Sequence, residues 1–367
     1  MAIRSMFVIL SDLHFGRDLH LGPELPPLRI TRMARLLRRD DEIDRFIERN
    51  CGGHDFACVS MLARQLKLIV HEARTDEHFE RENFDFCLLL GDQATTPDPQ
   101  AYNFLRQYLT SARYTSATDC VGLGFRPDQL LAIPGNHDKL FRTNLDIYQR
   151  EFVRKLGLPE VEPGGSRVVI RRFAETEIVF LMIDPSIYAT EELTIDLECR
   201  LHLASGAVTP GLAQEVVKKM TSLRDTGEVD GQRLRGKFGS ALKILLVHYA
   251  VDLPRLPRSR QWSEKFLPHG CEGLDDLVAT LRTEFQFQLA IHGHMHVAWL
   301  YNHGGVQVIS SSTASGKSGN NGFFVLKFSD NNEIRAEHHC WTGNRFTPDP
   351  EKPLTRPLGT LPAGAAA

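Results

Sequence analysis

Short apolar runs alternate with helix-like segments through most of the chain. Runs of this length, bounded by turn-forming residues, are typical of strands buried on both faces. They span residues 7–10, 86–90, 130–133, 178–183, 244–247 and 288–291. The segments between them predict helices at about 33–49, 61–73, 100–112, 143–156, 210–223 and 273–285. This alternation indicates an α/β protein.

The C-terminal part of the chain has a different pattern. Segments with little helical periodicity, separated by Gly- and Asn-rich turns, predict further strands. They cover about 296–301, 305–311, 321–328 and 333–340. Residues 17–82 separate the first two strands by far more than one helix requires, so we interpret them as a helical insertion. We predict one domain over residues 1–342 and an extended or disordered Pro/Ala-rich tail over 343–367.

Composition narrows the class of protein. Apolar residues make up 42% and charged residues 24%, which excludes wholesale disorder, collagen and coiled coils. The formal net charge of −3 argues against a strongly basic nucleic-acid binder. The start of the chain has no signal-peptide pattern, and no stretch reaches the roughly 18 apolar residues of a membrane span. The seven cysteines are scattered without a CxxC pair, so we expect a cytoplasmic protein with reduced thiols and no membrane contact.

Five of the predicted strands are followed directly by side chains suited to metal binding. These segments are Ser11-Asp12-Leu13-His14, Gly91-Asp92, Gly135-Asn136-His137-Asp138, His248 and Gly293-His294-Met295-His296. In open α/β sheets the carboxyl ends of the strands form the ligand-binding edge. Residues two apart on extended backbone point the same way, so Asp12 with His14, and His294 with His296, can each supply two ligands to one place.

The side-chain types predict which metals would bind. Carboxylate, imidazole and amide oxygen without thiolate suit Mn or Fe, with Zn or Ni as alternatives. Seven such groups exceed one tetrahedral site but suit two ions about 3.5–4 Å apart that share a carboxylate. Asp92 stands alone on its turn and is the natural bridging residue.

Taken in this order, the five segments resemble the motifs of the calcineurin-like metallophosphoesterase family. The resemblance runs from residue 7 to about 296 and implies a four-layer αββα sandwich of two mixed sheets flanked by helices. It implies that the first metal is held by Asp12, His14 and His296. It implies that the second is held by Asn136, His248 and His294. Asp92 would bridge the two, a water or hydroxide between them would be the nucleophile, and His137 would face the scissile phosphate and assist the leaving oxygen.

The residues after Asp92 separate the chain from two subfamilies. Protein Ser/Thr phosphatases carry an Asp-Arg-Gly shortly after this position, and purple acid phosphatases carry a Tyr three residues after it, where this chain has Thr95. What remains resembles bacterial nucleotide and cyclic-nucleotide phosphodiesterases, although His248-Tyr249-Ala250 departs from the cyclic-nucleotide pattern. We therefore predict a metal-dependent phosphodiesterase acting on a nucleotide or a related small phosphodiester.

Three other functions remain open from the sequence. A DNA or RNA nuclease resembling double-strand-break repair nucleases would use nucleic acid as its partner, with the arginines at 29, 32, 35, 38 and 39 on phosphates. The same arginines also fit a solvated helical face. The other two are a phosphomonoesterase and an idle scaffold. We interpret His292, His303 and the His338-His339 pair as structural or surface residues, and the Ser311–Asn321 segment as a polar loop bordering the pocket.

Overall fold

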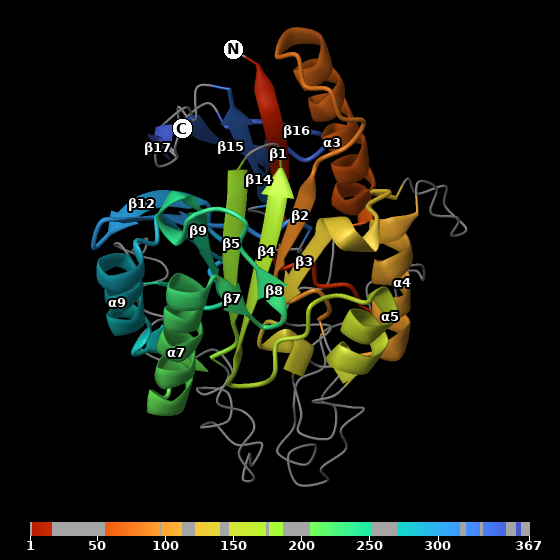
Figure 1. Ribbon diagram of the computed structural model, residues 1–367. Helices are drawn as coiled ribbons and strands as arrows, with labels where there is room; N and C mark the ends of the chain where they lie inside the picture. The colour runs from red at the N-terminus through yellow and green to blue at the C-terminus, as the bar shows by residue number, and fades with distance from the viewer. Residues whose placement is uncertain are drawn as a thin grey trace, which may run out of the picture.

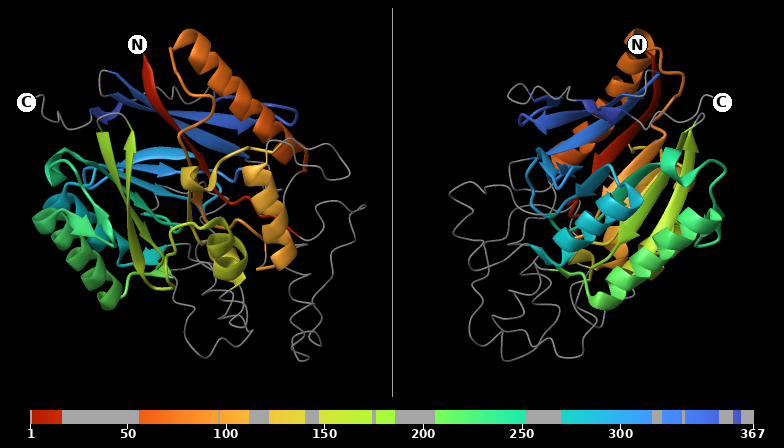
Figure 2. Two further views of the ribbon diagram at one scale, coloured as in Figure 1. Left: turned by 45° about the vertical axis from the view of Figure 1, so that its right-hand side comes forward. Right: turned by 60° about the vertical axis from the view of Figure 1, so that its left-hand side comes forward.

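The chain folds into two β-sheets that lie between two layers of helices (Figure 1). This computed structural model describes residues 2–16, 56–95, 97–111, 122–139, 147–173, 176–185, 206–251, 270–315, 321–330, 333–349 and 357–360. Figure 2 shows the layers from two further sides. The predicted αββα sandwich of two mixed sheets is confirmed.

The first sheet is built on three parallel strands. They are β1 (Ile3–Leu10), β2 (Phe86–Leu90) and β3 (Leu130–Ile133). Nearly every residue in them is buried, as the continuous apolar runs predict. On the other side β1 pairs antiparallel with β14 (Gly322–Ser329), which pairs antiparallel with β15 (Glu333–Trp341).

This sheet continues past the domain boundary predicted at residue 342. The strands β16 (Phe346–Pro348) and β17 (Pro357–Thr360) both pair antiparallel with β15. The Phe346 ring lies 5.1 Å from those of Phe323 and Trp341, and burying it offsets the cost of ordering this segment. Residues 346–348 and 357–360, within the stretch predicted as an extended or disordered tail over 343–367, therefore belong to the sheet, and Pro348 lies on the edge strand β16, where proline is tolerated.

The second sheet has a parallel centre and antiparallel edges. Its parallel strands are β5 (Thr176–Ile183), β9 (Leu242–Leu246), β11 (Leu289–His292) and β13 (Val306–Ser310). The edges are β12 (Trp299–His303) and β4 (Ser166–Phe173). The sequence pattern did not predict β4, because arginines leave it an apolar run of only Val168 to Ile170. Two-residue strands pair as β6 (Gly206–Ala207) with β10 (Cys271–Glu272) and as β7 (Glu228–Val229) with β8 (Gln232–Arg233).

Helices cover the outer face of each sheet. On the first sheet these are α3 (Phe56–Asp76) and α4 (Pro99–Thr110), with the short α5 (Arg154–Leu156) nearby. On the second sheet they are α7 (Pro210–Thr226) and α9 (Leu274–Phe285). Thr209 caps α7 by accepting from the Leu212 N–H, 3.2 Å away, with Pro210 in the first turn as predicted. Among the described helices, none combines the length and apolar character needed to cross a bilayer.

The α3 helix changes the interpretation of the predicted insertion. It lies within residues 17–82, and its residues Leu62, Leu66 and Ile69 belong to the same buried cluster as Val8 of β1. This part of the segment is a layer of the sandwich itself. The predicted helix over 33–49 lies outside the described residues.

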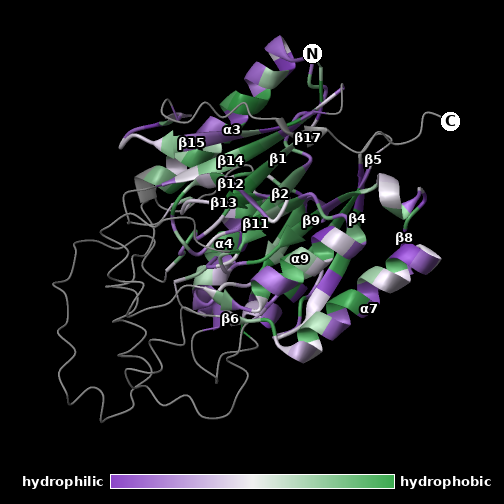
Figure 3. Ribbon diagram, turned by 90° about the vertical axis from the view of Figure 1, so that its left-hand side faces the viewer, coloured by the Kyte–Doolittle hydropathy of each residue, from purple (hydrophilic) through white to green (hydrophobic). Residues whose placement is uncertain are grey.

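The core between the sheets fixes their stacking. Phe7 of β1 lies 5.1 Å from Phe86 of β2 and 6.2 Å from Phe180 of β5, measured between ring centroids. Figure 3 shows hydrophobic strands inside and hydrophilic positions on the helices. Because this packing fixes the two sheets against each other, the loops that follow their strands also keep fixed relative positions.

The buried His339 predicts an acid-sensitive fold. Its ring stacks on Phe323 at 5.0 Å, and neither nitrogen has a hydrogen-bond partner among the described residues. Burial and nearby His338 lower the pKa of His339 to about 3, from 6.5. The stability that this neutral ring supports is therefore full above pH 6.5 and lost as pH falls.

Replacing His339 with Phe should reduce the loss of unfolding free energy at acid pH. Between pH 6.5 and 5 we expect His339→Phe to lose about 2 kcal/mol less unfolding free energy than the wild type, measured by denaturant titration of metal-free protein. His71→Gln, on the exposed side of α3, is the control and should follow the wild type. Equal pH slopes for His339→Phe and the wild type would rule out this origin.

Candidate metal centre

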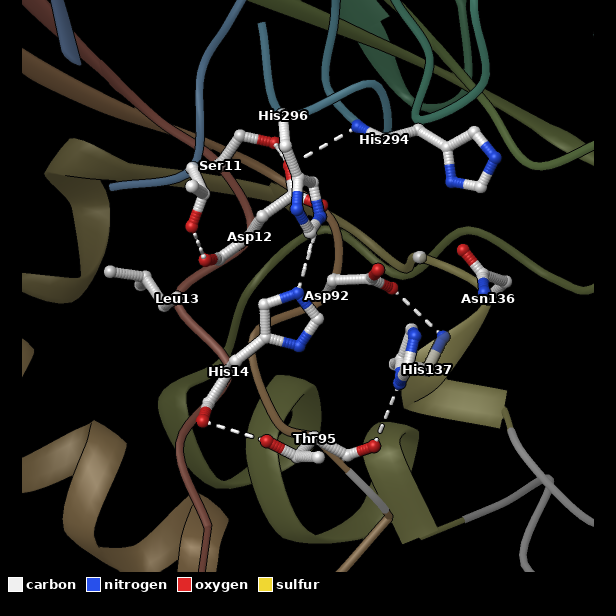
Figure 4. Close-up of polar contacts among 12 residues, drawn as sticks. Ser11, Asp12, Leu13, His14, Asp92, Thr95, Asn136, His137, His294 and His296 are labelled. Carbon is white, nitrogen blue, oxygen red and sulfur yellow. Dashed lines mark hydrogen bonds and ion pairs between the residues drawn. The ribbon is translucent and has the colours of Figure 1, made fainter. Parts of the chain in front are cut away.

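Side chains from the carboxyl ends of five strands meet at one position between the sheets. Figure 4 shows those that follow β1, β2, β3 and β11. Their backbones are joined across the loops: Asp12 N–H donates to Gly91 O at 3.1 Å, and Gly293 N–H donates to His248 O at 3.1 Å. The predicted ligands converge here as two clusters. Because the loops follow buried strands, the geometry depends on the strand registers rather than on the loops alone.

The first cluster contains Asp12, His14, Asp92 and His296, whose ligand atoms all lie within 4.8 Å of one another. Asp12 Oδ1 is 3.0 Å from His296 Nε2, and His14 Nε2 is 3.4 Å from the same nitrogen. The first three side chains are buried, and His296 is 23% exposed. These atoms surround a common point that opens to solvent on the His296 side.

The second cluster contains Asp92, His248 and His294, again within 4.8 Å of one another. His248 Nε2 lies 3.5 Å from Asp92 Oδ1 and 3.0 Å from Asn136 Oδ1. His248 Nδ1 lies 2.7 Å from Leu90 O, so it donates its proton to that carbonyl and leaves Nε2 facing the cluster. Asp92 is common to both clusters, which is the position predicted for a bridging carboxylate.

The charges in the clusters suit a cation. Burial raises the pKa of Asp12, but His296 and His248 together bring it down to about 2. Asp92 also has a pKa well below its ordinary value: burial raises it, and His248 and His137 more than offset that effect. Burial and His137 lower the pKa of His14 to about 3. At neutral pH the site therefore holds two carboxylates and a neutral imidazole, the protonation states that metal ligands require.

The surroundings of His248 also favour a positive charge at this site. Burial lowers its pKa, but Asp92 and Asp12 outweigh burial and raise it to about 9. A proton on Nε2 then satisfies the oxygens around it, and a metal ion would take the place of that proton. Asp12 Oδ1 is buried and accepts no well-aligned hydrogen bond from the described residues, whereas Oδ2 accepts from His294 N–H at 3.1 Å. The donor set, with this buried oxygen that faces the nitrogen of His296, fits a metal ion.

The backbone that carries the ligands is unusual. Left-handed φ values between 51° and 67° occur at Asp12, His14, Asp92, His294 and His296. Such values are uncommon outside glycine and cost on the order of 1 kcal/mol each unless the surroundings enforce them. The neighbouring glycines leave the necessary room, since a Cβ at Gly135 would lie 2.1 Å from Asp92 Oδ1. The strain is concentrated at the ligand positions.

His137 lies beside the clusters and belongs to neither. Its backbone N–H donates to Asp92 Oδ1 at 2.8 Å, and its ring Nδ1 lies 2.9 Å from Thr95 O. Its ring is edge-on to that of His14, with centroids 4.9 Å apart. The Nδ1 contact orients the ring, as Figure 4 shows, and leaves Nε2 free of that carbonyl.

Several supporting residues were not identified as such from the sequence. Asp138 braces its loop by accepting from Gly135 N–H at 3.0 Å and Tyr102 O–H at 2.9 Å. Lys139 forms a fully buried ion pair with Asp184, which follows β5 and ties the His137 turn to the second sheet. No local pattern marks this pair, because its members come from different sheets. The interpretation of His292 as structural agrees with its buried contact to Tyr301 at 3.0 Å.

Comparison with known proteins places the chain in a family. The model of the calcineurin-like phosphoesterase family matches residues 6–298. A search of curated proteins finds no match. Among solved structures, GAP50, the anchor in the inner membrane complex of Plasmodium, has 10% identity and a TM-score of 0.44, covering 94% of this chain and 86% of its own.

Two hydrolases are similar at the same level. Sulfate thiohydrolase SoxB of Thermus thermophilus has 13% identity and a TM-score of 0.43, covering 95% of this chain and 57% of its own. This chain therefore spans little more than half of that protein. Phosphopantetheinyl hydrolase of Mycobacterium tuberculosis has 12% identity and a TM-score of 0.37, covering 85% and 91%.

Proposed function

Since the chain belongs to the calcineurin-like phosphoesterase family, we propose that it is a metal-dependent phosphodiesterase that hydrolyses a nucleotide or related small phosphodiester. The observation that supports this most is the pair of ligand clusters that share Asp92. Two clusters with one common carboxylate suit two ions at the spacing used in hydrolytic displacement at phosphorus.

Each cluster would hold one metal ion. The first would be bound by Asp12, His14, Asp92 and His296. The second would be bound by Asp92, Asn136, His248 and His294. Mn or Fe fits these oxygen and nitrogen donors, with Zn or Ni as alternatives. When bound, such ions supply Lewis-acid charge that acidifies a coordinated water and offsets the negative charge of the phosphoryl oxygens.

His137 would donate a proton to the leaving group. Its Nδ1–H is engaged with Thr95 O, 2.9 Å away, so Nε2 is the nitrogen left to face substrate, and it carries a proton to donate when the ring is an imidazolium. An imidazole with one nitrogen fixed in this way can donate from the other to a departing alkoxide near neutral pH. Asp92 would hold the turn that carries it, through the 2.8 Å bond from His137 N–H.

The loop after Asp92 supports a diester rather than a monoester. Gln93 is buried and donates to Ile133 O at 3.0 Å, and Thr95 is buried with its hydroxyl on His14 O at 2.8 Å. These side chains hold the fold of the loop and carry no positive charge. A phosphomonoester dianion has one more charge to neutralise than a diester monoanion, so the diester suits this loop better.

This preference predicts the outcome of a paired assay. With Mn²⁺ present, we expect kcat/KM for bis(p-nitrophenyl) phosphate to exceed that for p-nitrophenyl phosphate by about tenfold, or about 1.4 kcal/mol. EDTA should abolish both activities, and added Mn²⁺ should restore them. A strong preference for the monoester would refute the diesterase, and full activity in EDTA would refute the metal centre.

A panel of cyclic nucleotides, dinucleotides, capped nucleotides and DNA would then identify the substrate. The arginines on which the nuclease alternative depends lie outside the described residues. Hydrolysis of DNA, with binding that weakens steeply as salt rises, would favour that alternative. Among the described residues, Cys87, Cys271 and Cys340 form no disulfide, which supports a reducing compartment such as the cytoplasm.

A further inference from the structure

A run of hydroxyl-bearing residues after β13 is buried without exception in its described part. Ser311 to Ser315 reads Ser-Ser-Thr-Ala-Ser, and each of these residues is at most 2% exposed. We expected this segment to border the pocket as a polar loop. Five consecutive residues with four hydroxyls are seldom buried unless each hydroxyl has a partner. Their partners therefore indicate what the segment does.

The segment's bonds go to the turn that carries Asp12 and His14. Ala314 N–H donates to Ser11 O at 2.7 Å, and Thr313 Oγ1 donates to Asp12 O at 2.8 Å. Ser315 Oγ donates to Leu13 O at 2.8 Å. The next carbonyl, that of His14, accepts from Thr95 Oγ1 at 2.8 Å. Four consecutive carbonyls are thus each held by a donor from elsewhere in the chain.

This is the stretch where the backbone is strained. Asp12 and His14 have φ values of 53° and 51°, which orient their side chains into the first cluster. A left-handed conformation at a non-glycine residue persists only where its surroundings over-determine it. The donors from Thr313, Ser315 and Thr95 supply that constraint at the carbonyls themselves.

The segment is anchored in turn on both sheets. Ser311 N–H donates to His292 O at 2.7 Å in the second sheet, and Gly322 N–H at the start of β14 donates to Thr313 O at 2.8 Å. Ser312 Oγ lies 3.3 Å from Nε2 of His338, whose Nδ1 lies 3.2 Å from the Asp349 carboxylate. A line of polar contacts therefore runs from the C-terminal part of the first sheet to the segment beside the metal centre.

From this arrangement we infer that Thr313 and Ser315 are positioning residues. They hold the Asp12–His14 turn in its left-handed form and so set the affinity of the first cluster for its metal. The contacts from Asp349 through His338 to Ser312 hold the segment in place on the side of the first sheet. The inference rests on the metal centre proposed above. It assigns a role to hydroxyls that touch neither substrate nor metal.

Mn²⁺ titration of metal-free protein by calorimetry tests this role. Thr313→Val removes the hydroxyl at nearly constant shape, and we expect one of the two Mn²⁺ affinities, that of the first cluster, to fall about tenfold, the scale of one buried hydrogen bond. Thr313→Ser keeps the hydroxyl and should restore most of the affinity. Asp349→Ala, at the far end of the line, should cause a smaller loss in the same direction.

Thr110→Val is the matched control, because it removes a hydroxyl that donates to a carbonyl, Arg106 O at 2.8 Å, on α4. Melting temperatures are recorded for all variants without metal. A purely structural role would lower the melting temperature of Thr313→Val while Mn²⁺ affinity stays equal to the wild type, and that result would overturn the inference. Wild-type protein that binds no Mn²⁺ would instead overturn the proposed function, so the two failures are distinguishable.

Discussion

Asp92→Asn is expected to lose nearly all hydrolytic activity, by about 10³-fold or more in kcat (about 4 kcal/mol). Asp92 is the one side chain common to both ligand clusters, so its charge acts on both metal positions at once. Asparagine keeps the size of the side chain and can keep the acceptor for His137 N–H, 2.8 Å away, but it removes the negative charge. We therefore expect metal content to fall from two ions per chain to one or none.

Activity and metal content by mass spectrometry are measured together for this variant. Asp85→Asn is the matched control: Asp85 is also a carboxylate at a β2 terminus and accepts from the Ser5 hydroxyl at 2.6 Å, but at the opposite end of the strand. It should keep wild-type metal content and turnover. Two bound ions and normal turnover in Asp92→Asn would exclude a bridging role.

His137→Gln should give the second largest loss, of about 10²–10⁴ in kcat for a substrate with an alkoxide leaving group. Unlike Asp92→Asn, it should leave metal content unchanged, because His137 lies outside both clusters. The loss should shrink for a p-nitrophenolate leaving group, which departs without needing a proton. This dependence separates proton donation from a general disturbance of the site.

The measurement is kcat for a series of phosphodiesters whose leaving groups span a range of pKa. His303→Gln, on β12 near α9, serves as the control and should follow the wild type across the series. An equal loss for all leaving groups would assign His137 a role in binding or folding instead.

The parts of the fold that the sequence predicted are those specified by contiguous residues. The apolar runs of β1, β2 and β3 are buried on both faces, so their pattern identifies them without knowledge of the rest of the chain. The β4 strand was not predicted because it lies at an edge, where Arg171 and Arg172 remain partly or fully exposed and interrupt the pattern. The β16 strand was not predicted either, because Phe346 packs against partners on other strands.

The candidate site shows the same division. Its ligands follow strands directly, and the order Asp12, Asp92, Asn136, His248, His294 could be read along the chain. The residues that hold these ligands in place could not be predicted from the sequence. Thr313 reaches Asp12 O across 301 positions of sequence, and the Lys139–Asp184 pair joins two sheets. Such contacts exist only after the strands have stacked, and a serine or threonine carries no local signal that it will brace a backbone carbonyl.

Anomalous diffraction from crystals grown with Mn²⁺ tests the central claim, a two-metal centre shared through Asp92, most directly. We predict two peaks about 3.5–4 Å apart. One should lie among Asp12, His14, Asp92 and His296, and the other among Asp92, Asn136, His248 and His294. A single peak, or peaks elsewhere, in crystals of protein that is fully active with Mn²⁺ would contradict the claim.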